Sequence, residues 1–255
     1  MKVTFLGTGT SSGVPMIGCD CNVCTSIDPR DQRLRSSLLL SIDQHNYAID
    51  CGPDFRQQML SNKIKQLHGI IYTHEHHDHT SGLDDIRGFN FFMNQPMNLY
   101  LTERVESAIK KEFAYVFDEN KYPGIPEVNL INIHTQADFM LCNGTTVTPI
   151  EVMHLRLPVL GFRIGNFSYI TDANFISEAS IQKLKGTEIL VLNALRHEKH
   201  ISHFTLNEAI EMSRTIGAKQ TYFTHISHQL GLHDEVAPNL PAGFSLAYDG
   251  LSIEV

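Results

Sequence analysis

Short apolar segments rich in β-branched and aromatic residues recur along the whole chain, separated by glycines, prolines and polar residues. Segments of this length and composition are typical of strands that bury one or both faces. They predict strands over Val3–Leu6, Ser37–Ile42, Tyr47–Asp50, Gly69–Tyr72, Asn98–Leu101, Thr146–Val152, Gly161–Ile164, Phe167–Ile170, Glu188–Leu192 and Gln220–Phe223. Strands therefore dominate the predicted structure.

Two residue pairs predict tight hairpins. Asn143-Gly144 and Asp249-Gly250 each separate two apolar segments. Asn-Gly and Asp-Gly tolerate the positive φ angles that short hairpin turns require. The strands so joined would be Phe139–Leu141 with Thr146–Val152, and Phe244–Tyr248 with Leu251–Val255.

Helical periodicity appears in two longer segments. Glu103–Phe117 repeats apolar residues every three or four positions, which is the spacing of an amphipathic helix. Leu206–Ile216 shows the same period and is followed by Gly217, a residue type that commonly ends helices. Shorter helices are expected over Phe55–Leu60 and Ile181–Lys185.

Helices alternate with strands along the chain, and no linker, charge block or internal repeat divides it. This order predicts an α/β fold and a single domain over residues 1–255. The segment Asp118–Glu127 holds Pro123, Gly124 and Pro126, and prolines disfavour both helices and central strands. We expect this segment to form an exposed loop.

The composition is that of an ordinary globular protein of 255 residues, with 42% hydrophobic and 19% charged residues. Twenty Lys and Arg against 28 Asp and Glu give a net charge of -8, which offers no global electrostatic support for binding nucleic acid or an anionic membrane. The first residues lack the apolar core of a secretory signal, and no segment approaches the ~18 apolar residues of a membrane span. A cytoplasmic location is expected, where the five cysteines would be thiols or metal ligands rather than disulfides.

Candidate chemistry is concentrated directly after the predicted strand Gly69–Tyr72. The segment there reads His74-Glu75-His76-His77-Asp78-His79. His74 and His76 are two residues apart and can point to one side, whereas Asp78 and His79 lie further along the turn. Imidazole and carboxylate ligands suit Zn, Mn or Fe, so this segment could serve two ions, each with further ligands from elsewhere. A solvated histidine-rich loop is the alternative, and the Asp-His pair at this offset disfavours it.

The segment Thr73–His79, followed by Ser81-Gly82-Leu83, resembles the HxHxDH signature of the metallo-β-lactamase superfamily. The resemblance implies the superfamily's αββα sandwich, with two metal ions at one edge of the paired sheets. It also implies an activity class, metal-dependent hydrolysis, without naming the substrate.

The same resemblance implies the rest of the metal site, because lone His and Asp residues end three predicted strands in the order of the superfamily. These residues are His154, Asp172 and His225. One ion would bind His74, His76 and His154, the other Asp78, His79 and His225, and Asp172 would bridge the two. Asp50 matches a strand-ending aspartate of the superfamily and would orient a ligand histidine through its other ring nitrogen.

A second group of candidate ligands lies near the start of the chain. Gly18–Cys24 contains Cys19, Cys21 and Cys24 in a C-x-C-x2-C pattern. Three thiolates could hold a structural zinc if a fourth ligand comes from elsewhere, and buried thiols or a redox set are the alternatives. Cys51 and Cys142 lie outside this group and are expected to be small core residues.

Further segments are similar to the PhnP family, the phosphodiesterases of the bacterial carbon–phosphorus lyase pathway, and its close relatives. These segments are Thr8–Gly13, Gly18–Cys24, Thr224-His225-Ile226-Ser227-His228 and Leu240–Gly250. This resemblance implies that His228 completes a structural zinc site with the three cysteines. It also implies that His203, just before the Leu206–Ile216 helix, contacts substrate phosphate and transfers a proton without binding metal.

Other residues compete for substrate contact. His197 and His200 are alternatives to His203. Candidates for phosphate binding are the arginines Arg87, Arg156 and Arg196. The glycine-rich segment Gly7–Gly13 matches neither G-x-G-x-x-G nor a P-loop, so we expect a flexible loop near the active site rather than a phosphate cradle. His154–Pro158 is bulkier than the matching loop of the PhnP family, which leaves the substrate open.

The sequence thus predicts a dinuclear-metal phosphodiesterase that hydrolyses small or cyclic phosphodiesters, such as ribosyl or nucleoside cyclic phosphates, through a metal-bridged hydroxide. Asp78 and Asp172 would hold the metals, and His203 would protonate the leaving oxygen. A tRNA 3′-processing endonuclease is disfavoured by the acidic charge, and a thioester hydrolase by the cysteine segment. A non-catalytic binding or carrier protein of cofactor biosynthesis is the rival from another class, and the presence of all seven ligands disfavours it. The sequence leaves the oligomeric state open.

Overall fold

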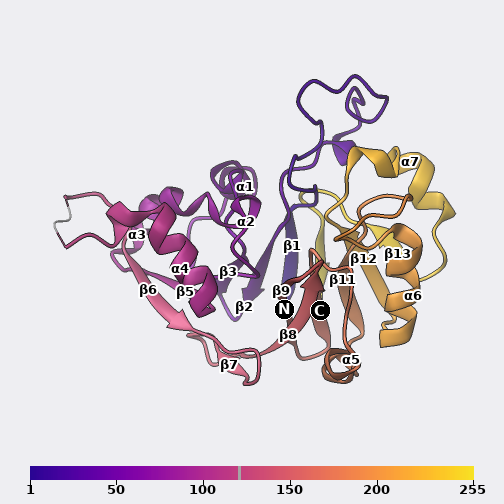
Figure 1. Cartoon of the computed structure of the whole chain (residues 1–255). Coiled ribbons are helices and arrows are strands. Elements are labelled where there is room, and N and C mark those ends of the chain that lie inside the picture. The colour runs from indigo at the N-terminus through magenta and orange to yellow at the C-terminus, as the bar shows by residue number, and fades with distance from the viewer. Residues whose placement is uncertain (120–121) are drawn as a thin grey trace.

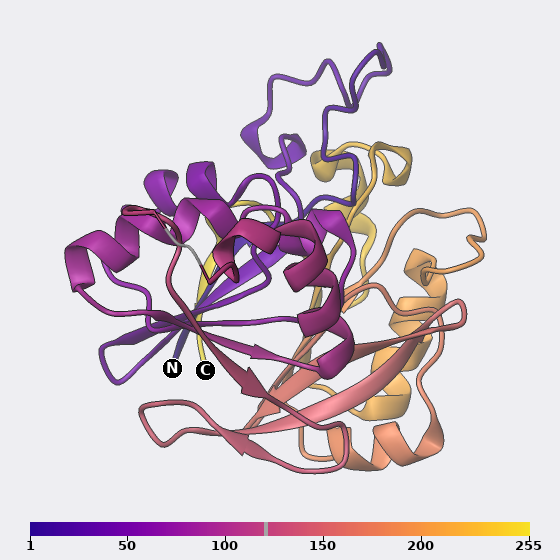
Figure 2. The same ribbon diagram turned by 60° about the vertical axis from the view of Figure 1, so that its left-hand side comes forward.

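The computed structural model describes residues 1–119 and 122–255. In this part of the chain, two seven-stranded sheets pack face to face, and helices cover the outer face of each sheet (Figures 1 and 2). The strand orders are β14-β1-β2-β3-β4-β5-β6 and β13-β12-β11-β10-β9-β8-β7. The predicted α/β class and αββα sandwich are confirmed.

The first sheet joins both ends of the chain. Its strands are β1 (Lys2–Gly7), β2 (Ser37–Ile42), β3 (His45–Ile49), β4 (Gly69–Ile71), β5 (Met97–Leu101), β6 (Val128–Asn132) and β14 (Ser252–Glu254). β1 pairs antiparallel with both β2 and β14, so the two termini lie side by side (Figure 1). From β3 to β6 the strands are parallel, and their carboxyl ends meet at one edge of the sheet.

The second sheet mixes antiparallel and parallel pairs. Its strands are β7 (Phe139–Met140), β8 (Thr146–His154), β9 (Leu157–Ile164), β10 (Phe167–Ile170), β11 (Ile189–Asn193), β12 (Gln220–Thr224) and β13 (Phe244–Leu246). β9 is antiparallel to both β8 and β10, and β10, β11 and β12 are parallel. The ends of β8, β10 and β12 therefore lie at the same edge of this sheet.

The described residues form seven α-helices, and four of them overlap a predicted helix. The seven helices are α1 (Phe55–Ser61), α2 (His77–Thr80), α3 (Arg87–Met93), α4 (Glu103–Glu112), α5 (Glu178–Leu184), α6 (Leu206–Ile216) and α7 (His233–Val236). A capping box of Thr205 and Glu208 starts α6, and Gly217 ends it with a φ of 84°. α4 is shorter than expected, because Phe113 leaves the helical conformation and a separate 3₁₀ turn, Ala114–Val116, follows.

Three apolar layers hold the sandwich together. Between the sheets, Phe5 and Tyr47 of the first sheet pack with Phe162 and Tyr169 of the second. Each of these large side chains is almost completely buried, and such burial contributes roughly 2–3 kcal/mol per side chain. Two further clusters fill the space between each sheet and its helices. The packing fixes how the two sheets meet, and hence how close their strand ends lie.

One of the two hairpin predictions is confirmed and the other is wrong. Around Asn143-Gly144, β7 and β8 pair antiparallel, and Gly144 has a φ of 85°. Asp249-Gly250 also forms a tight turn, but β13 belongs to the second sheet and β14 to the first. The turn residues favour a reversal of the chain, but they do not determine whether the two strands that follow and precede the turn pair with each other.

The two cysteines outside the cysteine segment differ in burial. Cys51 is fully buried as expected, but Cys142 is exposed, with its Sγ 3.0 Å from the Tyr47 hydroxyl, so its assignment to the core is wrong.

In the predicted loop Asp118–Glu127, residues 120 and 121 lie outside the described residues. The described remainder is mostly exposed, and Ile125 is buried against the first sheet's helical layer.

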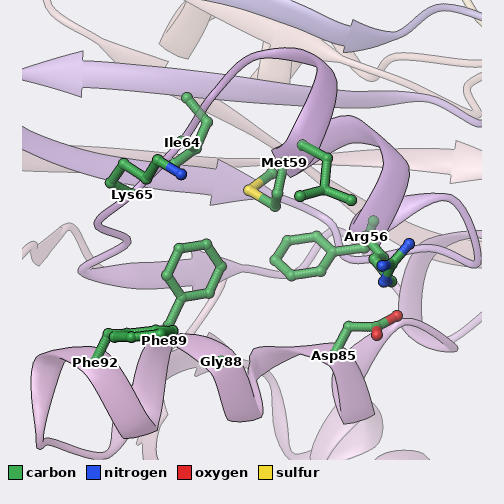
Figure 3. A pocket seen from close by; sticks show the side chains of 10 residues that line it. Arg56, Met59, Ile64, Lys65, Asp85, Gly88, Phe89 and Phe92 are labelled. Atoms are coloured by element: carbon green, nitrogen blue, oxygen red, sulfur yellow. The ribbon is translucent and has the colours of Figure 1, made fainter.

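An apolar groove lies between α1 and α3, with a cavity volume of about 210 Å³ (Figure 3). Met59, Ile64 and Phe89 line it, together with a few charged side chains. None of its lining residues belongs to the histidine segment, so the candidate chemistry lies elsewhere.

Among the described residues, no helix is both long and apolar enough to cross a membrane.

Candidate metal centre

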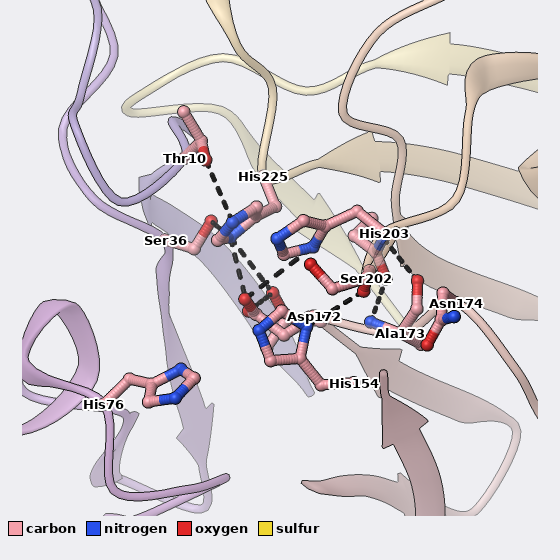
Figure 4. A network of polar contacts seen from close by, with 12 residues as sticks. Thr10, Ser36, His76, His154, Asp172, Ala173, Asn174, Ser202, His203 and His225 are labelled. Carbon is pink, nitrogen blue, oxygen red and sulfur yellow. Dashed lines mark hydrogen bonds and ion pairs between the residues drawn. The ribbon is translucent and has the colours of Figure 1, made fainter. Parts of the chain in front are cut away.

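Potential metal ligands gather at the edge of the sandwich where strands of both sheets end (Figure 4). The loop after β4 and the short helix α2 bring the histidine segment from the first sheet. From the second sheet come the last residue of β8 and the residues that follow β10 and β12. The side chains brought together in this way are His74, His76, Asp78, His79, His154, Asp172 and His225. We call them the histidine cluster.

Three residues at these strand ends adopt a left-handed backbone conformation. The φ angles are 65° at Asp50, 55° at Asp172 and 55° at His225. This conformation costs a non-glycine residue roughly 1–2 kcal/mol, and such strain is found most often at functional sites. The turns direct the side chains from both sheets toward one point.

Asp172 lies at the centre of the cluster. Its Oδ2 is 3.2 Å from His79 Nε2 and 3.3 Å from His225 Nδ1. Ligand atoms lie within 4.8 Å of one another in three groups, and Asp172 belongs to each of them. The groups are His74, His79 and Asp172; Asp78, Asp172 and His225; and His154, Asp172 and His203. Asp172 is therefore the carboxylate that these three groups share.

The cluster has the chemistry of a cation site. His203 Nδ1 is buried without a hydrogen-bond partner among the described residues, and His79 Nε2, which also makes no hydrogen bond there, lies 3.2 Å from the carboxylates of Asp78 and Asp172. An unsatisfied buried polar atom costs roughly 1–3 kcal/mol, and divalent ions accept imidazole and carboxylate donors together. The residues present therefore fit divalent metal ions.

Groups behind the cluster orient the histidines. His79 Nδ1 donates to Asp50 Oδ2 at 2.6 Å, and Asp50 also accepts from the backbone and hydroxyl of Thr73, each at 2.8 Å. His154 Nδ1 donates to the Ser202 carbonyl oxygen at 2.9 Å. Because one ring nitrogen is engaged in each case, the other is directed into the cluster. The structure thus places Asp50 where it can orient His79.

Burial and the neighbouring charges set the protonation of the cluster. Burial lowers the pKa of His74 well below its usual value and also lowers the pKa of His225. Burial opposes the charge of Asp172 as well, but His225 and His79 outweigh it and hold the Asp172 pKa well below its usual range. For His79, the carboxylates of Asp50 and its neighbours outweigh burial and raise the pKa. The neutral imidazoles and the charged carboxylates suit the binding of cations, whereas His79 would release its proton when a cation binds.

Removing the charge behind His79 tests this arrangement. Asp50→Asn keeps the shape of the side chain, but it no longer offers a carboxylate to His79 Nδ1. We expect the affinity of the cluster for divalent metal to fall by roughly 10- to 100-fold, as is usual when such a supporting partner is lost. Competition with a chelating dye would measure it, and Asp138→Asn on the exposed surface is the matched control. Equal affinities in the two variants would contradict the role of Asp50.

Sequence reasoning missed the residues that hold His225 in place. Thr10 Oγ1 lies 3.1 Å from His225 Nε2, and Ser36 Oγ lies 3.3 Å from His225 Nδ1. Both residues come from the long connection between β1 and β2, which no motif marks. The Gly7–Gly13 segment lies at the site as expected, but backbone hydrogen bonds hold it: Ile226 N donates to Thr8 O, and Gly9 N to Leu34 O. This segment supports His225 rather than cradling phosphate.

His203 lies between two members of the cluster. Its ring centroid is 4.6 Å from that of His154 and 4.8 Å from that of His225, and its Nδ1 is 3.9 Å from Asp172 Oδ1 (Figure 4). Burial and the nearby His225 lower the pKa of His203 to about 3. At this position His203 could contact a substrate, and its distances would also permit metal binding.

The competing candidates lie further from the cluster. The His200 ring is 5.1 Å from that of His203 and more exposed. Arg196 donates to Gln229 Oε1 at 2.6 Å, and Arg87 pairs with Asp84 on the surface. Arg156 is exposed in the turn directly after His154. The structure therefore brings neither Arg87 nor Arg196 into contact with the cluster.

The three cysteines and His228 form a second group, which we call the cysteine cluster. Cys19 Sγ and Cys21 Sγ each lie 3.3 Å from His228 Nδ1, and the four ligand atoms, including that of Cys24, lie within 4.8 Å of one another. The hydrogen bond with His228 lowers the pKa of Cys21 to about 6, which favours the thiolate. This donor set matches a closed tetrahedral zinc site.

The segment that carries the cysteines has little apolar support. It projects from one end of the sandwich (Figure 1), and Ile17 and Ile27 within it are almost completely exposed. Its own core is small, consisting of Val14, Val23 and Cys24 with a few partly buried neighbours. A metal ion would replace the missing core as the main constraint on this segment.

Cys21→Ser should therefore remove zinc from the cysteine cluster and lower the stability. We expect the unfolding temperature to fall by roughly 5–10 °C, on a scale of about 2–4 °C per kcal/mol for a chain of this size. Metal analysis and calorimetry would measure both effects. Cys142→Ser, which changes an exposed thiol outside the cluster, should alter neither quantity. Unchanged zinc content in Cys21→Ser would show that the cysteines bind no zinc.

Comparison with known proteins agrees with the fold and the site. The model of the beta-lactamase superfamily domain matches residues 45–226. The crystal structure of a new diphosphatase from the PhnP family superposes with a TM-score of 0.92 at 42% identity, covering 100% of this chain and 97% of that one. The fold and the clustered His and Asp residues define a metal-dependent hydrolase of the metallo-β-lactamase type. The chain belongs to the beta-lactamase superfamily and, within it, to the PhnP family.

Two curated relatives carry other names. An octanoyltransferase from Porphyromonas gingivalis is 40% identical over 253 residues, which make up 98% of this chain and 51% of that protein. The chain thus spans about half the length of this relative. Coenzyme PQQ synthesis protein B from Methylobacterium radiotolerans is 28% identical over 306 residues, covering the whole of both chains. The relatives therefore share a family while differing in their named roles.

Proposed function

We propose that residues 1–255 form one hydrolase domain that cleaves small phosphodiesters with two divalent metal ions at the histidine cluster. The observation that carries the proposal is the position of Asp172, which is shared by the ligand groups from both sheets. We assign His74, His76 and His154 to one ion, Asp78, His79 and His225 to the other, and Asp172 to both. Zn or Mn, and also Fe, suit this set of nitrogen and oxygen donors. We assign a structural zinc to Cys19, Cys21, Cys24 and His228.

The chemistry of such a site is well defined. When bound, two divalent ions lower the pKa of a coordinated water toward ~7 and attract the oxygens of a phosphate. The chain's own residues supply the geometry: Asp50 holds the ring of His79, and Thr10 and Ser36 hold that of His225. Because these supports are buried, the ligands are fixed before the substrate binds, and little reorganisation is needed during the reaction.

His203 is the proposed proton donor to the leaving oxygen. Its buried Nδ1 is unpartnered, and its ring lies against His154 and His225. Binding of an anionic phosphate beside the ring would favour its protonated form and offset the effect of burial. A donor at this position would stabilise the negative charge that develops on the leaving oxygen.

A diphosphate is the second candidate substrate, because the similar PhnP-family structure is that of a diphosphatase. Cleavage of a phosphoanhydride also proceeds by attack at phosphorus, so the same residues would serve. The relative named octanoyltransferase is about twice as long as the region matched, so its name carries no assignment for this chain. The predicted non-enzymatic alternative, a carrier protein, is disfavoured, because the fold and the clustered ligands define a metal-dependent hydrolase.

One assay panel separates these functions. Metal-reconstituted protein would be tested against bis-p-nitrophenyl phosphate, 2′,3′-cyclic nucleotides, a nucleoside diphosphate sugar, a pre-tRNA, S-lactoylglutathione and an octanoyl thioester. We expect turnover of the phosphodiesters, and Asp172→Asn is the inactive control. Preference for the diphosphate would favour the second candidate. Turnover of the thioesters or the pre-tRNA alone, or of no substrate, would overturn the proposal.

A further inference from the structure

Three exposed apolar side chains lie on three loops beside the histidine cluster. Leu155, Phe175 and Ile201 are 52%, 56% and 71% exposed. Leu155 directly follows His154, Phe175 is three residues beyond Asp172, and Ile201 precedes the residue whose carbonyl accepts from His154. Single exposed apolar residues need no explanation, but a group of them around a reactive centre indicates a binding surface. We call these three residues the apolar rim.

Asn174 ties the three loops of the apolar rim together. Its Oδ1 accepts from Leu155 N at 2.7 Å, and its Nδ2 donates to the Ile201 carbonyl at 3.2 Å. The backbone of Met153 donates to Phe175 O and accepts from Asn174 N, each at 2.9 Å. Figure 4 shows Asn174 beside Ser202 and His203. The apolar rim is therefore a fixed part of the site and not a set of independent loop tips.

The backbone of Leu155 gives an independent indication. Its φ is 58°, in the left-handed region that a branched side chain rarely adopts. Glycine or asparagine would relieve this conformation, yet the position holds a large apolar side chain that is half exposed. Strain at an exposed position beside the metal ligands indicates that the side chain serves binding rather than folding. The adjacent Arg156 is exposed, with no hydrogen bond or ion pair to the described residues.

We propose that the apolar rim binds an aromatic group, such as a nucleobase, that is carried on the scissile phosphate, and that Arg156 attracts a further anionic group of the same substrate. This inference rests on the proposed hydrolysis of phosphodiesters and narrows it to substrates with an aromatic substituent. An exposed phenyl ring offers a stacking surface, and aliphatic side chains on the neighbouring loops would exclude water from the stack. A guanidinium beside them matches the second charge of a diphosphate.

The test compares two diesters that share one leaving group, phenyl p-nitrophenyl phosphate and methyl p-nitrophenyl phosphate. Wild-type protein is expected to show a KM for the phenyl ester that is lower by roughly 5- to 50-fold, the usual range for stacking on one aromatic side chain. Phe175→Ala should remove this preference by raising the KM for the phenyl ester, with kcat and the methyl ester little affected. Phe91→Ala is the matched control, because Phe91 is an exposed phenylalanine on α3 that is 80% exposed.

A second variant separates binding from folding. Leu155→Gly relieves the positive φ and should leave the unfolding temperature unchanged or higher, while the KM for the phenyl ester rises. A lower unfolding temperature with an unchanged KM would assign Leu155 to folding and count against the apolar rim.

Binding of two inert ligands keeps the apolar rim testable apart from turnover. Phenylphosphonate should bind metal-loaded wild-type protein more tightly than methylphosphonate does, and Phe175→Ala should equalise the two dissociation constants. If no diester is cleaved but this difference is found, the proposed function fails and the apolar rim stands. If diesters are cleaved without any phenyl preference, or if Phe175→Ala and Phe91→Ala behave alike, the apolar rim is overturned and the proposed function stands.

Discussion

Replacement of Asp172 by alanine is expected to remove metal from the histidine cluster while leaving zinc in the cysteine cluster. Asp172 is almost completely buried and belongs to each of the three groups of neighbouring ligand atoms. Without its carboxylate, His79 and His225 would lose their shared anionic neighbour. The positive charges of two bound cations would then be less well neutralised, so the cations would repel each other more strongly. Metal analysis should show the loss of the catalytic ions, and hydrolysis should fall to background.

The variant Asp172→Asn distinguishes loss of metal from loss of the folded structure. Asparagine tolerates the left-handed backbone conformation of Asp172, so the turn after β10 should survive. Its unfolding temperature in the presence of chelator should therefore match that of chelator-treated wild type. Cys21→Ser should show the opposite loss, with the zinc gone and the catalytic ions retained. Identical metal contents in the Asp172 and Cys21 variants would refute the existence of two separate sites.

His203→Ala is expected to lower turnover by roughly 10²- to 10⁴-fold, the usual contribution of a positioned proton donor. Metal content and unfolding temperature should stay near wild type, because His203 is assigned to the substrate and not to a metal. The loss should shrink for p-nitrophenyl leaving groups, which need no proton in the transition state. His200→Ala is the matched control, since His200 lies beside His203 but outside the ligand groups.

Each outcome for His203 has a separate meaning. Loss of metal would make His203 a ligand, as its distances to His154 and Asp172 would allow, and would question the assignment of His225. Equal losses with p-nitrophenyl and alkyl leaving groups would mean that His203 binds phosphate without donating a proton. Unchanged activity would remove His203 from the site and make His200 the next residue to test.

The sequence by itself determined the features that depend on neighbouring residues. The histidine segment carries several ligands within six positions, so its chemistry is visible without a fold. α6 was predictable to the residue because its capping box and its terminal glycine are local signals. His154, Asp172 and His225 each follow a predicted strand, but it was the resemblance to the metallo-β-lactamase superfamily that identified them as candidate ligands.

Only the tertiary structure decided which segments meet. The turn at Asp249-Gly250 joins two sheets and not two paired strands, because β13 pairs with β12 in the second sheet and β14 with β1 at the other end of the chain. Thr10 and Ser36 reach His225 across separations of more than 180 residues, and no local spacing encodes such contacts. Asn174 likewise gathers the apolar rim from three loops. Local patterns specify helices and strands through backbone geometry. Contacts between these elements depend on how the two sheets pack, and this packing cannot be predicted from any one short segment.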